Sequence, residues 1–100
     1  MVNEHIIKVI NEYTEALKGA FTIDKVFLFG SFSKGISSET SDIDIAVIIK
    51  GKVDYEDELK AMKLRRNIDL RIEPHLFSLE ELENSNPFLE EIIRKGVKVA

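Results

Sequence analysis

The clearest pattern near the N-terminus is a stripe of apolar side chains at helical spacing. Ile6, Ile10, Tyr13 and Leu17 recur every three or four residues within the segment 3–18. This period places side chains on one face of an α-helix. We therefore predict a helix over residues 3–18 whose apolar stripe packs against the rest of the domain.

Three runs of strand-forming residues follow along the chain. Residues 26–29 are apolar and end at a glycine, and residues 42–49 begin with an aspartate and become wholly apolar. Residues 68–72 alternate apolar and charged side chains, which is typical of a strand with one polar face. We predict a strand over each of these three ranges.

Helices are predicted between the second and third strands and again after Pro74. The first of them carries an N-cap residue, Asp54, ahead of an apolar face. Two later helix starts are indicated. Ser78 and Glu81 have the spacing of a capping box, and Asn86 is an N-cap residue followed by Pro87. With a short edge strand over residues 97–99, this order predicts a small α/β sheet with helices on one or both faces.

Composition narrows the class of protein. The 100 residues are 44% hydrophobic and 32% charged, which is the balance of one globular domain spanning residues 1–100. Cysteine is absent, so disulfides and thiolate sites are excluded. The net charge of −4 disfavours binding to duplex nucleic acid. Without a membrane-length apolar run or a signal sequence, a soluble cytoplasmic protein is expected.

The candidate chemistry begins with two carboxylates at the start of the second predicted strand. Asp42 and Asp44 stand two residues apart, so their side chains point to the same face, about 7 Å apart along the backbone. Two such carboxylates repel each other unless a cation lies between them. Mg²⁺ prefers hard oxygen ligands of this kind and keeps positions open for water and phosphate.

Two further features extend this candidate site. Gly30 and Ser31, which directly follow the first predicted strand, suit close approach of a phosphate. Asp69 shares a face of the third predicted strand with Arg71 and Glu73, and it would lie near the first two aspartates if that strand were their neighbour. Three carboxylates on adjacent strands are able to hold two Mg²⁺ ions for an in-line displacement at phosphorus.

The linked pattern resembles a known family. A Gly-Ser pair, a spacer, an Asp-x-Asp with apolar flanks and a later aspartate are similar to the DNA polymerase beta superfamily of nucleotidyltransferases. The resemblance is strongest over residues 25–73 and is closest to the minimal nucleotidyltransferases (MNT). These proteins are typically encoded beside a HEPN-family protein and act with it as an antitoxin–toxin pair. The resemblance implies a mixed sheet with its core strands in the order 1-2-3.

The same resemblance implies a site for two Mg²⁺ ions and ATP. It assigns metal binding and catalysis to the three carboxylates, Asp42, Asp44 and Asp69. It assigns the triphosphate to Gly30 and Ser31, and Lys34 is a further candidate contact. Many relatives have an arginine directly after the Gly-Ser pair, where this sequence has Phe32.

The implied reaction is transfer of AMP from ATP to an acceptor hydroxyl, with pyrophosphate released. Larger relatives hold the acceptor with a second domain. We expect no room for one in 100 residues, so a separate protein, a HEPN toxin modified on tyrosine, is the natural acceptor. Two alternatives stay open: a non-catalytic antitoxin that covers its partner, and a small-molecule nucleotidyltransferase of the aminoglycoside type completed by homodimerisation.

Overall fold

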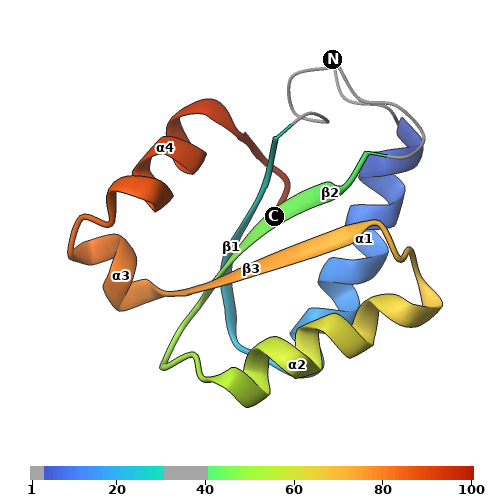
Figure 1. Cartoon of the computed structure of the whole chain (residues 1–100), viewed down its shortest axis with the longest axis horizontal. Coiled ribbons are helices and arrows are strands. Elements are labelled where there is room, and N and C mark those ends of the chain that lie inside the picture. Colours follow the sequence, from blue (N-terminus) through green and yellow to red (C-terminus); the bar gives the residue numbers. More distant parts are fainter. Residues whose placement is uncertain (1–3, 31–40) are drawn as a thin grey trace.

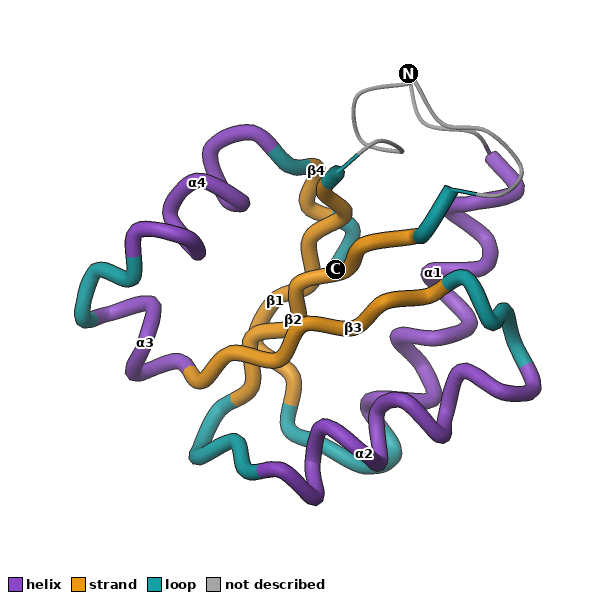
Figure 2. Tube along the Cα trace, viewed as in Figure 1, coloured by secondary structure: helices purple, strands orange, loops and turns teal. Residues whose placement is uncertain are grey.

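The computed structural model describes residues 4–30 and 41–100, which form a layered α/β structure around one sheet (Figures 1 and 2). The described strands lie in the order β3-β2-β1-β4. β1 is antiparallel to both β2 and β4, and β2 is parallel to β3. Their bounds are Ile23–Phe29 for β1, Ile43–Ile49 for β2, Ile72–Ser78 for β3 and Val97–Lys98 for β4. The predicted core order 1-2-3 is therefore confirmed, and β4 extends the sheet beyond β1.

Helices cover the two faces of this sheet. On one face lie α1 (Glu4–Lys18) and α2 (Tyr55–Leu64), with α2 continued by a short 3₁₀ turn, η1 (Arg65–Asn67). On the other side lie α3 (Leu79–Glu83) and α4 (Pro87–Lys95) (Figure 1). Within the described residues, no helix is long and apolar enough to cross a membrane.

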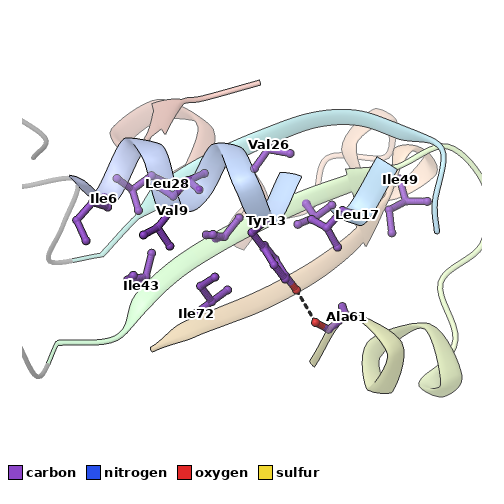
Figure 3. Close-up of a cluster of buried hydrophobic side chains, with 13 residues drawn as sticks. Ile6, Val9, Tyr13, Leu17, Val26, Leu28, Ile43, Ile49, Ala61 and Ile72 are labelled. Carbon is purple, nitrogen blue, oxygen red and sulfur yellow. Dashed lines mark hydrogen bonds between the residues drawn. The ribbon is translucent and has the colours of Figure 1, made fainter. Parts of the chain in front are cut away.

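The larger core lies between the sheet and the α1/α2 layer. Alternate residues of β2 point into it and are fully buried: Ile43, Ile45 and Val47. Tyr13 of α1 donates a hydrogen bond of 2.6 Å from its hydroxyl to the carbonyl oxygen of Ala61 in α2 (Figure 3). Burial raises the pKa of the Tyr13 phenol, so the hydroxyl keeps the proton that it donates. This bond fixes the two helices of the layer to each other.

A smaller core lies on the opposite face. Its buried members come from β1, β2, β3 and α4, and they are Phe27, Ala46, Ile48, Phe77, Leu89 and Ile92. The predicted caps hold the helices of this side. Ser78 and Glu81 form both hydrogen bonds of a capping box, and Asn86 accepts a hydrogen bond from the Leu89 amide. A second capping box, between Asp54 and Asp57, begins α2 on the other face.

The third strand differs from the prediction. It begins at Ile72, the residue at which it was predicted to end. Residues 68–71 form a turn instead, in which the Asp69 amide donates to the Arg65 carbonyl and the Ile72 amide donates to the Asp69 carbonyl. Pro74 does not end the strand, because β3 lies at the edge of the sheet, where a residue without an N–H group is tolerated.

Candidate metal and nucleotide site

Three side chains able to bind a metal meet on one face of the sheet. They are Asp44 of β2 and Glu73 and His75 of β3, and their ligand atoms all lie within 4.8 Å of one another. The parallel register explains the meeting, because Asp44 stands directly beside Glu73, and His75 follows two residues later on the same face of β3. All three side chains are half-buried.

The histidine ring is held from two sides. Its Nε2 atom lies 3.4 Å from Oδ1 of Asp44. The ring of Phe29, at the end of β1, packs against it edge-on with centroids 5.1 Å apart. Because Phe29 is also the antiparallel neighbour of Asp44, Phe29, Asp44 and Glu73 form one row across three strands.

Gly30 brings the end of β1 directly against the carboxylate of Asp44. Its φ of +76° lies in the left-handed region, and a Cβ atom at this position would stand only 2.5 Å from Oδ2 of Asp44. A side chain at this position would be strained by the backbone conformation, and it would push the Asp44 carboxylate aside. The turn that was predicted to receive phosphate therefore starts beside the aspartate that was predicted to bind metal. Ser31 and Lys34 lie outside the described residues.

Asp42 stands apart from the group of three. It directly precedes β2, two residues before Asp44, and it is exposed. It does not belong to the set of ligand atoms within 4.8 Å. Its predicted role as a metal ligand stays a prediction.

Asp69 lies in the turn before β3, so the predicted position on the strand beside Asp44 is wrong and Glu73 occupies it. Both carboxylate oxygens of Asp69 bind the guanidinium of Arg71, with Oδ2–Nη2 at 2.8 Å and Oδ1–Nε at 3.0 Å. This hydrogen bonding holds the pKa of Asp69 below its usual value. Its metal-binding role stays a prediction, made for a carboxylate that already has a cationic partner.

Neither Glu73 nor His75 was predicted to bind a metal. The signal that would have found them is the alternation of Glu73 and His75 with the apolar residues Ile72, Pro74 and Leu76, which becomes visible once the strand is continued through the proline. The donor set they form with Asp44 fits a divalent cation. Carboxylate oxygens are the ligands of Mg²⁺, and imidazole nitrogen is accepted by transition metals.

The comparison with protein families decides the family of this chain. The model described as "Polymerase beta, Nucleotidyltransferase" matches residues 4–100. This chain belongs to the polymerase beta nucleotidyltransferase family. The match confirms the resemblance drawn from Gly30 and the Asp-x-Asp pair, and it makes the protein a nucleotidyltransferase.

Individual relatives agree with this family. A Methanocaldococcus jannaschii protein named "Putative protein adenylyltransferase MJ0141" is 27% identical over 94% of this chain and 98% of its own length. A chain in a crystal structure of a toxin–antitoxin with AMP-PNP has a TM-score of 0.69 at 25% identity, covering 90% of this chain and 71% of that chain. The complex of a tri-AMPylated Shewanella oneidensis HEPN toxin with its MNT antitoxin contains a chain with a TM-score of 0.65 at 21% identity, covering 95% and 71%. This last likeness shows the fold.

Proposed function

We propose that this protein transfers AMP from ATP to a hydroxyl of a separate protein, a tyrosine of a HEPN-type toxin, and so acts as its antitoxin. The observation that carries the proposal is the meeting of Asp44, Glu73 and His75 beside the glycine that ends β1. The choice of reaction and acceptor is supported by the names of similar proteins: a "Putative protein adenylyltransferase", a toxin–antitoxin with AMP-PNP, and an MNT antitoxin in complex with a tri-AMPylated HEPN toxin.

In this reaction the acceptor oxygen bonds to the α-phosphorus as the bond from that phosphorus to the bridging oxygen breaks. Pyrophosphate leaves, and the hydroxyl proton passes to a site carboxylate and then to water. Asp42, Asp44 and Glu73 would supply oxygen ligands for two divalent cations. Bound Mg²⁺ would neutralise charge on the phosphates and favour the deprotonated acceptor oxygen.

The phosphate side of the proposal depends on the end of β1. Gly30 leaves the space beside Asp44 free of a side chain, which allows a phosphate oxygen to approach the same carboxylate that binds the metal. Ser31 and Lys34 remain predicted contacts of the triphosphate. In the geometry of the described residues, Glu73 is better placed than Asp69 to act as the third carboxylate.

The test is a transfer assay with a candidate acceptor protein. The purified chain is incubated with Mg²⁺, ATP labelled at the α-phosphate and a HEPN-type protein from the same organism. We expect label on that protein and the mass of AMP added to it in intact mass spectrometry. Asp44→Asn should abolish the transfer, and Glu56→Gln, an exposed acid on α2, should not change it.

The same assay separates the two alternatives. If the toxin is neutralised without any added mass, and Asp44→Asn neutralises it equally well, the protein is a non-catalytic binding module. If label moves to an aminoglycoside and not to protein, it is a small-molecule nucleotidyltransferase. Either result would contradict protein AMP transfer.

A further inference from the structure

We propose that His75 makes this a mixed oxygen–nitrogen metal site that binds a transition-metal dication such as Zn²⁺ in preference to Mg²⁺. The inference rests on the proposed metal site, and it adds to that site the class of cation it selects. Two aspartates and a phosphate turn describe a Mg²⁺ site. The imidazole is an additional ligand with a different preference.

The geometry brings the imidazole to a ligand position. Glu73 and His75 project from the same face of β3, and Asp44 lies beside them on β2. Ligand atoms of one Zn²⁺ ion lie about 3–4 Å apart, given metal–ligand distances of about 2.1 Å. The three ligand atoms already lie within 4.8 Å of one another, so small side-chain rotations would bring them onto one ion.

The ring is oriented toward the carboxylates. Phe29 packs against it edge-on, and Nε2 faces Asp44 at 3.4 Å. A simpler interpretation is that His75 is only an ion-pair partner of Asp44 when it is protonated. The two interpretations differ in consequence, because an ion-pair partner affects every cation at the site alike. A metal ligand raises the affinity of the site only for those cations that accept a nitrogen ligand.

Selectivity follows from the donor set. Mg²⁺ holds to oxygen ligands and sheds its water reluctantly. Imidazole suits Zn²⁺, Fe²⁺ and Ni²⁺, and two carboxylates with one imidazole leave further positions open for water or phosphate. The nitrogen ligand therefore raises affinity for the transition metals and leaves affinity for Mg²⁺ almost unchanged.

The experiment uses the untagged full chain without ATP or partner, titrated separately with Zn²⁺ and Mg²⁺. The chain has two histidines, so the NMR signals of both rings are assigned with His75→Gln. We expect Zn²⁺ to shift the ring signals of His75 and leave those of His5 unchanged. By calorimetry, His75→Gln should lower the affinity for Zn²⁺ at least about tenfold and leave that for Mg²⁺ unchanged, and His5→Gln should alter neither.

Three results would overturn the inference: Zn²⁺ leaving the His75 signals in place, His75→Gln weakening Zn²⁺ and Mg²⁺ equally, or wild-type protein binding Mg²⁺ more tightly than Zn²⁺. His75→Asn serves as the second variant if His75→Gln does not fold. Because nucleotide and partner are absent, failure of AMP transfer leaves this result standing, and loss of Zn²⁺ selectivity leaves the transfer reaction standing.

Discussion

The two faces of β2 carry opposite kinds of residue. Toward α1 and α2 the strand presents Ile43, Ile45 and Val47, none of which is exposed. Toward α3 and α4 it presents Asp44 first, with 29% of its side chain exposed, and only then the buried Ala46 and Ile48. The alternation of one strand therefore supplies the core on one side and the polar site on the other.

The two faces of the sheet therefore have different roles: one stabilises the fold, and the other carries the candidate metal site. On the α1/α2 face the core side chains are buried, and the buried hydroxyl of Tyr13 donates a hydrogen bond to the carbonyl oxygen of Ala61 (Figure 3). The other face is apolar along most of its length and changes to Asp44, Glu73 and His75 at the end where β1 stops. Mutation of Asp44 should therefore lower activity without lowering stability, and mutation of its neighbour Ile45 should lower stability.

The largest expected effect is on activity. Asp44→Asn should lower the rate of AMP transfer at least about a hundredfold, since loss of groups that merely support metal ligands already costs about 10–100-fold. The unfolding free energy should not fall, because the change relieves repulsion with Glu73. Transfer assays and urea unfolding measure the two quantities. A fully active variant would rule out the metal role of Asp44.

The next effect is on stability, one residue further along. Ile45→Ala should lower the unfolding free energy by about 2–5 kcal/mol, because it leaves a cavity in the closed core. The milder Ile45→Val should cost about 0.5–1.5 kcal/mol, stay folded and bind metal as the wild type does. Urea unfolding and calorimetry check both. A change in metal affinity in Ile45→Val would contradict the separation of the two faces.

A substitution at Gly30 should change both the free energy of unfolding and the metal affinity. Gly30→Ala should destabilise the fold by about 1–3 kcal/mol through its left-handed backbone. It should also weaken metal binding, because the new Cβ would displace Oδ2 of Asp44. Gly51→Ala is the matched control, since Gly51 also has a positive φ but its Cβ would meet nothing within 4 Å. Equal metal affinities in the two variants would show that the contact with Asp44 does not matter.

Much of this molecule was predictable because its signals are local. Four predicted features are set by residues a few positions apart, and all of them appear in the structure: the apolar stripe of α1, the apolar run of β2, the N-cap of α2 at Asp54 and the capping box of Ser78 with Glu81. Gly30 and Asp44 came from a short linked motif, and their contact follows from the pairing of β1 with β2. The strand order came from the resemblance, since element order alone permits several arrangements.

The third strand could not be located in this way. Residues 68–72 and residues 72–78 both alternate, and which of them pairs with β2 is decided by long-range register. Pro74 looked like a terminus, although an edge strand accommodates it. The misplaced strand put Asp69 in the position beside Asp44 that Glu73 occupies, and it left His75 out of the candidate site.

The smallest expected effect tests that correction. Glu73→Gln should weaken binding of Mg²⁺ and Zn²⁺ at least about tenfold, and Asp69→Asn should leave both affinities unchanged, because the Asp69 carboxylate is engaged by Arg71.

The effect of Asp69→Asn should appear in the free energy of unfolding. The pKa of Asp69 is lowered in the folded state, so its ionised form stabilises the fold above the ordinary aspartate pKa near 4. This contribution is lost as the pH falls through the folded-state value. Asp69→Asn should therefore be slightly less stable than the wild type at neutral pH and lose less stability on acidification below about pH 4. Urea unfolding at several pH values and calorimetric metal titrations measure the two effects. If Asp69→Asn lowers the affinity for Mg²⁺ and Zn²⁺ as much as Glu73→Gln does, Asp69 is a metal ligand, as the resemblance to the nucleotidyltransferases implied.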